Sequence, residues 1–357
     1  MKRVGLIVGA NIEYAPYVKN YVKIFKDNQI EYKIIEYKKA NLEYSEKENI
    51  ISFQNKSKDF ENILDKLIGY YRFVKFVKNI LKEEKFFYLV VFTPQICLFM
   101  KSFLKKKYRK RYVLDIRDYS KVFKIPFFLK NLINNSLLTV ISSGGFKKWL
   151  PKEYNYLIDH NIIITKENLE INNLEKNKIK IINCGIIRSF NENLYLIKKL
   201  KNKKNIELEY RGTSLISDRL EEYVKINKIR NCKFYGYYKK EDENIFLKNS
   251  TFINIMQTND FLSKYALPNR FYKAILLKKP IIATSDNYVG DLVKKYNLGV
   301  IINKELLKED KNLEKQIKSF IFEFNLDNFS KNCESLYKKI KKEKENFEQV
   351  ILKLLGE

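Results

Sequence analysis

The residues from Asp260 to Thr284 combine a helix start with flanking cations, a pattern that can hold a phosphate group. Leu267-Pro268-Asn269 predicts the first turn of a helix, because proline has a suitable fixed φ there and gives up no N–H that the helix needs. The amides of such a turn attract anions, and Lys264 and Arg270 add positive charge beside them. On this local pattern alone, an ordinary helix start in an α/β protein is the simpler interpretation.

The elements that must position this segment alternate between short apolar runs and longer amphipathic stretches, which predicts βα units and parallel sheets. In the first half we expect strands over residues 3–8, 31–37, 87–92, 111–116 and 137–141. In the second half we expect strands over residues 180–184, 206–210, 233–235, 252–255, 280–284 and 300–302. The clearest helical patterns cover residues 59–81, 215–227, 268–277, 304–322 and 327–355. The predicted fold class is therefore α/β.

A polar stretch over residues 165–178 separates the two series and predicts a linker. We expect one Rossmann-like domain over 1–164 and a second over 179–326. The last helix, 327–357, is expected to pack back toward the first domain. Two doubly wound domains would face each other across a cleft, with ligands beyond the carboxyl ends of the strands. A chain of 357 residues is long enough for two such cores.

The chain is strongly basic, with 69 Lys and Arg against 42 Asp and Glu and a net charge of +27. The excess is densest in residues 71–130, which hold 16 basic and 4 acidic side chains, and above all in Lys105–Arg111. Each lysine near an anionic bilayer contributes about 1 kcal/mol, so this region predicts a peripheral position on the inner face of the plasma membrane. Codon usage in an AT-rich genome is a second source of the lysine excess.

Cysteine usage and hydropathy exclude other classes. The four cysteines lie far apart and the chain has one histidine, so neither a disulfide framework nor a zinc cluster is expected. The best apolar stretch, 88–100, is shorter than the roughly 20 residues of a membrane-spanning helix. The first apolar run is too short for a signal peptide. We expect a cytoplasmic protein.

Several motifs occur in the order found in bacterial GT-B glycosyltransferases of the family 4 type, which build surface and capsular polysaccharides. LPNRFYKAILLKKPIIAT (267–284) and NYVGDLVKKYNLGVII (287–302) resemble the donor-site region of that family. Three earlier segments resemble the glycine turns of its nucleotide domain: Cys184–Arg188, Tyr210–Gly212 and Phe234–Tyr237. Three further segments of this chain resemble parts of the family's acceptor domain: Asp115–Asp118, Ile141–Phe146 and His160-Asn161. The resemblance implies a GT-B fold and transfer of a sugar from a nucleoside-diphosphate donor.

One departure concerns a pair of glutamates, Glu-x7-Glu, that retaining members of the family usually carry. The second glutamate of that pair contacts the donor ribose. The matching positions here are Tyr265 and Lys273, and neither side chain is a carboxylate. The ribose contact is therefore missing or supplied elsewhere, and the donor and the stereochemistry do not carry over from the family.

The resemblance also implies what each donor-site residue does. Breaking the anomeric bond leaves negative charge on the diphosphate, so cations and helix amides must lie there. Arg188 is the first candidate, with Lys264 and the helix start as partners, while the glycines allow close approach of the nucleotide. The candidate donor site comprises Gly185, Arg188, Gly212, Thr213, Gly236, Lys264, Leu267, Pro268, Asn269, Arg270 and Lys273.

An inverting reaction needs a general base, which loops of the first domain should supply. Glu13 is one candidate, in the loop after the first strand together with Gly9 and Asn11. Asp118, just past the fourth strand, is the other. A helix cap by Glu13, or an ion pair of Asp118 with a neighbouring cation, is the alternative for each residue. A retaining reaction needs no protein base.

We expect no metal site, because no carboxylate or histidine cluster has a suitable spacing. The expected co-substrate is a nucleotide sugar, with UDP favoured, and the acceptor a cell-surface glycan or lipid-linked intermediate. Three alternatives stay open: a basic nucleic-acid-binding protein, a sugar-nucleotide epimerase and an inactive scaffold. No nucleic-acid-binding motif is found, one histidine gives little support to an epimerase, and the missing glutamate pair makes a scaffold conceivable.

Overall fold

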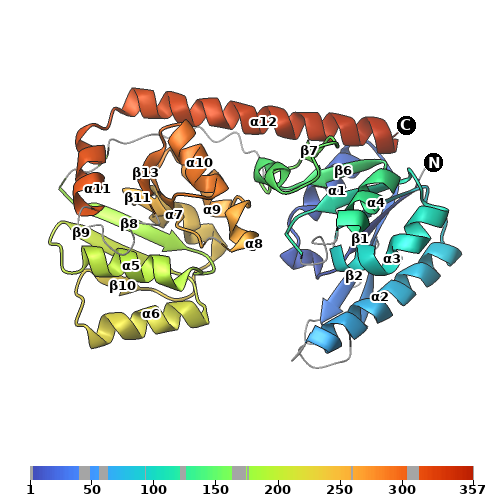
Figure 1. Ribbon diagram of the computed structural model, residues 1–357, viewed down its shortest axis with the longest axis horizontal. Coiled ribbons are helices and arrows are strands. Elements are labelled where there is room, and N and C mark those ends of the chain that lie inside the picture. Colours follow the sequence, from blue (N-terminus) through green and yellow to red (C-terminus); the bar gives the residue numbers. More distant parts are fainter. Residues whose placement is uncertain are drawn as a thin grey trace. The chain divides into compact units, whose positions relative to one another are not determined.

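The computed structural model describes residues 3–39, 49–55, 63–92, 94–120, 126–162, 174, 177–258, 260–303 and 313–356. The chain divides into two compact units, the first made of Met1–Ile163 with Lys342–Glu357 and the second of Ile164–Lys341. Each unit is a parallel sheet flanked by helices (Figure 1). Most of the linker predicted at 165–178 lies outside the described residues.

The sheet of the first unit has, among the described residues, seven parallel strands in the order β3-β2-β1-β4-β5-β6-β7. They are β1 (Val4–Val8), β2 (Tyr32–Lys39), β3 (Ile50–Asn55), β4 (Tyr88–Val91), β5 (Tyr112–Ile116), β6 (Leu138–Ile141) and β7 (Leu157–Ile158). All five predicted strands are present. The two that were not predicted, β3 and β7, are the edge strands of the sheet, where a half-buried or two-residue strand leaves little apolar pattern.

The helical elements of the first unit connect these strands. They are η1 (Ile12–Tyr14), α1 (Val18–Asp27), α2 (Ile63–Glu83), α3 (Pro94–Lys107), α4 (Pro126–Asn135) and η3 (Gly144–Lys148). The end of the last helix, α12 (Leu326–Gly356), also belongs to this unit: Phe347, Ile351 and Leu355 are fully buried in its core. The ring of Phe347 contacts that of Tyr21 on α1 edge to face at 5.1 Å. Burial of this stripe fixes the end of α12 on the first sheet.

The sheet of the second unit has six parallel strands among the described residues, in the order β10-β9-β8-β11-β12-β13. They are β8 (Ile179–Cys184), β9 (Ile206–Arg211), β10 (Cys232–Phe234), β11 (Phe252–Asn254), β12 (Ile281–Thr284) and β13 (Gly299–Ile302). All six predicted strands are confirmed, with boundaries shifted by a residue or so.

The helical elements of the second unit are α5 (Phe190–Leu200), α6 (Leu215–Ile226), η4 (Lys240–Asp242), α7 (Glu243–Lys248), α8 (Phe261–Lys264), α9 (Asn269–Leu276), α10 (Tyr288–Lys295) and α11 (Leu313–Phe322). The predicted helices at 215–227 and 268–277 are confirmed as α6 and α9. The first part of the helix predicted at 304–322 lies outside the described residues. Helices α5, α6 and α11 share one core with the sheet, through residues such as Leu196, Leu220 and Ile317.

The strand order reverses direction between β8 and β11. From β8 the chain moves outward to β9 and β10, then returns to the other side of β8 to form β11, β12 and β13. Doubly wound sheets bind their ligands beyond the carboxyl ends of the two strands at such a reversal. The loops after β8 and β11 are therefore the place to look for a site. Among the described residues no helix is long and apolar enough to cross a bilayer.

Candidate functional site

Three glycine turns meet at the carboxyl edge of the second sheet. Gly185, Gly212 and Gly236 follow β8, β9 and β10, and all three have positive φ values, of 88°, 125° and 67°. The amide of Gly212 donates to the carbonyl oxygen of Gly236 at 2.6 Å. A Cβ atom on Gly212 would lie 1.9 Å from the carbonyl oxygen of Gly185. The absence of side chains here lets three turns pack together and leaves bare backbone at the edge.

The loop after β8 carries Arg188 and is held in an unusual conformation. Ser189, the residue before α5, adopts the left-handed region with φ 65° and ψ 64°. For a residue other than glycine this costs on the order of 1–2 kcal/mol. The side-chain amide of Asn193 donates to the carbonyl oxygens of Arg188 at 2.7 Å and Ser189 at 3.0 Å. The amide of Thr258, after β11, donates to the Ser189 hydroxyl at 3.2 Å. These bonds fix the backbone that presents Arg188.

Three buried asparagines extend this support under the reversal point. The side-chain oxygen of Asn193 accepts hydrogen bonds from Asn183 on β8 at 2.9 Å and from Asn254 on β11 at 3.0 Å. All three side chains are buried. A buried amide is costly unless it is hydrogen-bonded, so the network specifies one arrangement of β8, α5 and β11.

Arg270 reaches the same place from α9. Its guanidinium donates to the side-chain oxygen of Asn183 at 2.8 Å and to the carbonyl oxygen of Cys184 at 3.0 Å. Burial lowers the pKa of Arg270, and the charge of the nearby Arg188 lowers it further. Among the described residues, no carboxylate pairs with Arg188 or Arg270, and the Nε of Arg270 is buried without a hydrogen-bond partner. Two uncompensated guanidinium groups therefore lie close together at this edge.

The start of α9 adds backbone donors. Pro268 is the N-cap and its side chain provides no capping hydrogen bond, while Leu267 is buried and Asn269 is exposed. The amide of Phe271 donates to the carbonyl oxygen of Pro268 at 2.9 Å, and the N-cap side chain supplies no acceptor for the positive end of the helix dipole. Lys264, on α8, lies with its ammonium 5.9 Å from the centroid of the Tyr265 ring. Thr213 is exposed beside Gly212.

A buried carboxylate that the sequence did not predict lies next to this group. Glu243 begins α7, and its Oε2 forms ion pairs with Lys240 at 2.5 Å and with Lys273 at 2.7 Å. The hydroxyl of Tyr238 donates to its Oε1 at 3.1 Å. Burial alone would raise the pKa of Glu243, but the two lysines hold it below its usual value. Lys273, which stands at the second position of the Glu-x7-Glu comparison made above, is therefore paired with a glutamate from another helix.

In the first unit, Glu13 is exposed in η1, after β1. Its amide donates to the side chain of Asn11 at 2.8 Å, so Asn11 and not Glu13 caps this turn. A buried carboxylate below the loop, Glu36 on β2, accepts hydrogen bonds from the amide of Ile12 at 2.8 Å and from Ser52 at 2.7 Å. These contacts fix the Gly9–Glu13 loop and leave the carboxylate of Glu13 at the surface.

The second candidate base, Asp118, is also exposed, beyond a buried ion-pair network. Arg117 pairs with Asp115 and with Asp159, each at 2.6 Å. Lys344 on α12 pairs with the other oxygen of Asp159 at 2.8 Å. Two carboxylates and two cations balance in this network, which links β5, the residue after β7 and α12.

The single histidine lies close to this network. Its Nε2 is 2.7 Å from the Oε2 of Glu343, and the ring of His160 is buried. The contact joins the loop after β7 to α12, which fits a structural role.

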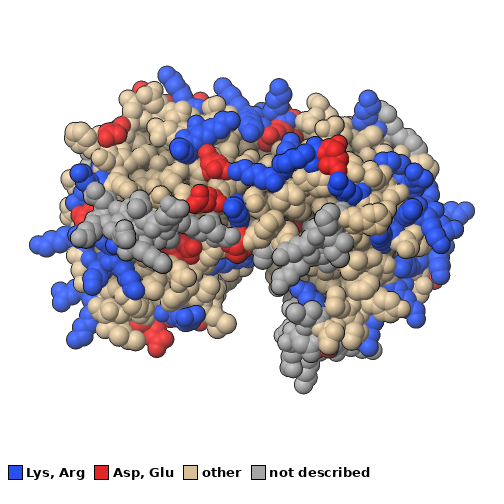
Figure 2. Space-filling view, in the orientation of Figure 1, with Lys and Arg blue, Asp and Glu red and all other residues tan. Residues whose placement is uncertain are grey.

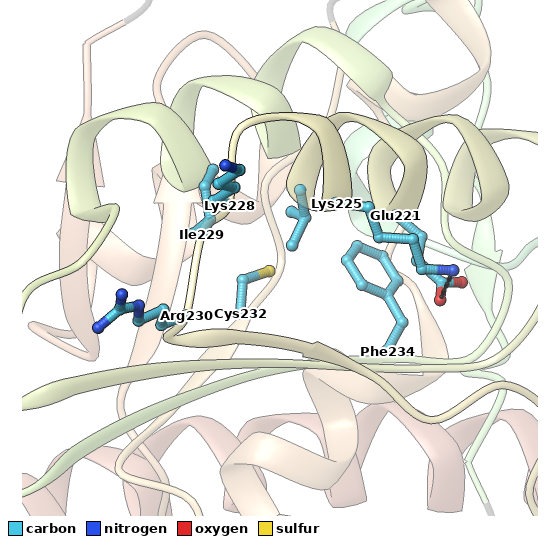
Figure 3. Close-up of a pocket in the computed structure, with 8 residues that line it drawn as sticks. Glu221, Lys225, Lys228, Ile229, Arg230, Cys232 and Phe234 are labelled. Atoms are coloured by element: carbon cyan, nitrogen blue, oxygen red, sulfur yellow. Dashed lines mark ion pairs between the residues drawn. The ribbon is translucent and has the colours of Figure 1, made fainter.

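A separate hollow of about 470 Å³ lies between α6 and β10 (Figure 3). It is lined by Glu221, Val224, Lys225, Lys228, Ile229, Arg230, Cys232 and Phe234. These residues lie on the second half of α6, on β10 and on the loop between them, and that loop enters β10 at the end opposite the carboxyl edge of the sheet. We do not assign the nucleotide to this hollow.

The whole chain is similar to several solved structures. Sucrose-phosphate synthase from Thermosynechococcus elongatus matches with a TM-score of 0.70 and 11% identity, covering 100% of both chains. The lipopolysaccharide outer core galactosyltransferase WaaB, in its apo form, matches with a TM-score of 0.68 and 13% identity, covering 98% of this chain and 99% of WaaB. Anabaena HepE in complex with UDP and glucose matches with a TM-score of 0.65 and 12% identity, with the same coverage.

No family model matches the sequence, and no curated protein does. The structural neighbours are GT-B glycosyltransferases, and at these identities the likeness shows the fold alone. The chain has the GT-B fold of two Rossmann-like domains, as its sequence predicted.

Proposed function

We propose that this protein is a glycosyltransferase that takes a sugar from a nucleoside-diphosphate donor bound at the carboxyl edge of the second sheet. The observation that carries the proposal is the pair Arg188 and Arg270, which has no carboxylate partner among the described residues. The Nε of Arg270 is buried, so its charge is costly without an anion, while Arg188 is exposed beside it and can meet an anion that arrives as a ligand. The glycine turns and the start of α9 lie in the same place in the fold, where a nucleotide would bind.

These groups have a direct use in glycosyl transfer. When the anomeric bond breaks, negative charge develops on the departing diphosphate. Fixed guanidinium groups and helix amides stabilise that charge without reorganising during the reaction. The Arg270 guanidinium is fixed by its bonds to Asn183 and Cys184, whereas the Asn193 hydrogen bond fixes only the backbone of Arg188. Lys264, Thr213 and the residues from Leu267 to Asn269 complete the donor site that we propose.

The similar structures support a UDP-sugar as the donor. HepE is solved in complex with UDP and with UDP-glucose, and WaaB is a galactosyltransferase. The motifs of the family 4 type in residues 179–302 point in the same direction. For an inverting reaction, the surface carboxylates of Glu13 and Asp118 stay our candidates for the general base in the first unit.

We further propose that the acceptor is a cell-surface glycan or lipid-linked intermediate, reached from the inner face of the membrane. On α2 an exposed stripe begins with Leu64, Ile68 and Tyr71 and continues with Lys75 and Lys82. The first four positions are three or four residues apart and Lys82 follows Lys75 by seven, so all of them lie on one face of the helix. An apolar stripe continued by lysines suits the surface of an anionic bilayer.

Neighbouring elements of the first unit repeat this combination. Phe127 on α4 is 74% exposed, and the ammonium of Lys101 on α3 lies 5.4 Å from its ring centroid. Lys and Arg side chains gather over α2 and α3 at the right-hand edge of the first unit (Figure 2). Codon usage alone would supply scattered lysines. It would not place exposed apolar side chains next to them.

The test is release of nucleoside diphosphate from a panel of sugar nucleotides. UDP-, GDP- and CDP-linked hexoses are each incubated with the protein and vesicles that contain bacterial lipid-linked saccharides. We expect one donor to be consumed and labelled sugar to appear in the lipid fraction. Interconversion of sugar nucleotides without an acceptor would favour an epimerase. Absence of turnover and of nucleotide binding would favour a scaffold or a nucleic-acid-binding protein.

A further inference from the structure

The four residues after β5 form a loop that is tied to three other connections at the carboxyl edge of the first sheet. The Arg117 guanidinium lies 4.8 Å from the centroid of the ring of Tyr17, the N-cap of α1. The Ser142 hydroxyl, after β6, donates to the Arg117 carbonyl oxygen at 3.0 Å. The Gln95 side chain, at the start of α3, donates to the Ser120 hydroxyl at 3.3 Å. These contacts fix both ends of the loop.

The two middle residues of this loop are accessible to solvent, and one of them is aromatic. Asp118 is exposed and Tyr119 is partly exposed. The Tyr119 ring meets the ring of Trp149 edge to face, with centroids 5.4 Å apart and planes at 89°. Trp149 follows η3, which itself follows β6, and it is also partly exposed. A carboxylate thus lies next to a pair of aromatic rings at the edge of the sheet.

Packing holds the Trp149 ring in this place. Its centroid lies 5.7 Å from that of Phe146, and Phe146 is fully buried. The short helix η3 is capped by Ser143, whose hydroxyl accepts a hydrogen bond from the Gly145 amide at 3.1 Å. The pair Tyr119 and Trp149 is therefore held by the core on one side and partly open to solvent. Such a pair is a preformed surface for a ligand that has an apolar face.

A pyranose ring matches this combination of groups. Its C–H bonds form an apolar face that packs on aromatic rings, and the hydroxyl groups at its rim donate hydrogen bonds to carboxylates. The rings of Tyr119 and Trp149 provide the apolar surface, and Asp118 provides the carboxylate. The aliphatic chain of a lipid has no hydroxyl groups, and a carboxylate repels a bare phosphate. The site therefore favours a sugar over a sugar-free lipid phosphate.

We propose that Tyr119 and Trp149 form an aromatic platform for the terminal sugar ring of the acceptor, and that Asp118 accepts a hydrogen bond from one of its hydroxyl groups. The inference rests on the proposed function, since that function defines an acceptor. It narrows the substrate class, because the acceptor then already ends in a sugar. A preceding glycosyl transfer must therefore supply this substrate.

Trp149 is the single tryptophan of the chain, which gives a direct test. Protein grown with 5-fluorotryptophan has one fluorine resonance, and this resonance reports on Trp149 alone. The probes are the methyl glycosides of glucose, galactose, mannose and N-acetylglucosamine, with undecaprenyl phosphate in detergent micelles as the sugar-free alternative. We expect at least one glycoside to shift the resonance saturably. Undecaprenyl phosphate should shift it no more than empty micelles do.

Variants separate stacking from other effects. Tyr119→Ala should weaken glycoside binding about tenfold, because part of the aromatic surface is lost, whereas Tyr119→Phe keeps the ring and should bind within about twofold of the wild type. Asp118→Asn should weaken binding about threefold or more, since a charge-assisted hydrogen bond becomes a neutral one. Phe87→Ala is the matched control and should retain the wild-type affinity. The Phe87 ring is 39% exposed and meets Tyr88 edge to face, but it precedes β4 at the opposite edge of the sheet.

The outcomes distinguish this inference from the proposed function. If a nucleoside diphosphate binds but no glycoside shifts the resonance, or undecaprenyl phosphate alone shifts it, the inference is wrong and the proposed function stands. The inference is also wrong if Tyr119→Phe loses as much affinity as Tyr119→Ala. A protein that binds a glycoside at Trp149 but no nucleoside diphosphate contradicts the proposed function and, with it, the acceptor role of the platform. Because Asp118 is exposed, Asp118→Asn keeps the test decisive if Tyr119→Ala does not fold.

Discussion

Arg270 donates a hydrogen bond of 3.0 Å to the carbonyl oxygen of Cys184, the last residue of β8. The bond joins the first turn of α9 to the strand whose end turns at Gly185. It places the Arg270 guanidinium beside the loop that carries Arg188, although the two arginines are far apart in the sequence. The proposed phosphate site is thus assembled from both sides of the strand-order reversal.

Replacing Arg270 should separate binding from stability. Arg270→Met breaks no ion pair among the described residues but removes the donor to Asn183 and to the Cys184 carbonyl, so we expect a loss of about 1–3 kcal/mol in the free energy of unfolding. Affinity for the nucleoside diphosphate should fall about 30-fold or more, since a charge-assisted bond is lost. Calorimetry and chemical denaturation measure the two effects. Unchanged affinity with a large loss of stability would show that Arg270 is structural.

The glycine turns provide a matched pair of substitutions. Gly212→Ala should destabilise the protein by more than about 2 kcal/mol, because φ is 125° and the new methyl group would meet the Gly185 carbonyl oxygen at 1.9 Å. Gly236→Ala also has a positive φ, of 67°, but its Cβ would meet nothing within 4 Å, so we expect a cost of only about 1 kcal/mol. Denaturant unfolding of both variants checks the order. Equal costs would contradict the close packing of the turns.

The buried network around Asp159 should make stability depend on pH. Burial alone would raise the pKa of Asp159, but Arg117 and Lys344 hold it below 3.8. A lowered carboxyl pKa contributes stability that is present above the unfolded-state pKa and is lost as the pH falls through the folded-state value. Lys344→Met should therefore cost about 3 kcal/mol at pH 7, and less at pH 3, which is closer to the lowered folded-state pKa of Asp159.

Denaturant unfolding at both pH values measures this difference. Burial raises the pKa of Asp115 despite its pairing with Arg117, so its effect on the pH dependence of stability is opposite to that of Asp159. Both the wild type and Lys344→Met contain Asp115, so this effect is common to the two proteins being compared. Lys342→Met is the control, because that side chain is exposed on the same helix and should change stability by less than about 0.5 kcal/mol. A Lys344→Met cost that does not depend on pH would contradict the assignment to Asp159.

The apolar stripe on α2 should determine membrane binding. Ile68→Glu removes an apolar side chain that is 49% exposed and adds a charge that an anionic surface repels, so we expect about tenfold weaker binding to anionic vesicles at physiological salt. Leu215→Glu, on α6 of the second unit, changes an even more exposed leucine and should have little effect. Co-sedimentation measures both. Equal binding by all three proteins would remove the support for this surface.

The fold could be predicted largely because buried parallel strands leave strong apolar runs. β8, β9 and β12 are buried along most of their length and were found in the sequence. β3 is only half-buried at the edge of its sheet and β7 has two residues, so neither has enough pattern to detect. The structure describes too little of 165–178 to test the predicted linker.

The candidate site was predictable only where neighbouring residues carry the signal. Gly185 and Arg188 belong to one turn, and their motif is local. Glu243 could not be found in this way, because its partner Lys273 comes from a different helix and the segment around it reads as an ordinary charged helix start. Asp159 and Lys344 meet only because α12 ends on the first unit. Pairings of this kind depend on tertiary packing and produce no periodic pattern in the sequence.

The most direct measurement is a thermal-shift titration with UDP, GDP, CDP, ADP and a short RNA, each at low and physiological salt. A ligand at 100 times its dissociation constant should stabilise the protein by about 2.7 kcal/mol. We predict that one nucleoside diphosphate raises the melting temperature at both salt concentrations and that Arg188→Ala or Arg270→Met abolishes the shift. If instead every polyanion acts alike and physiological salt removes the effect, the protein has no nucleotide site and the proposed transferase activity is wrong.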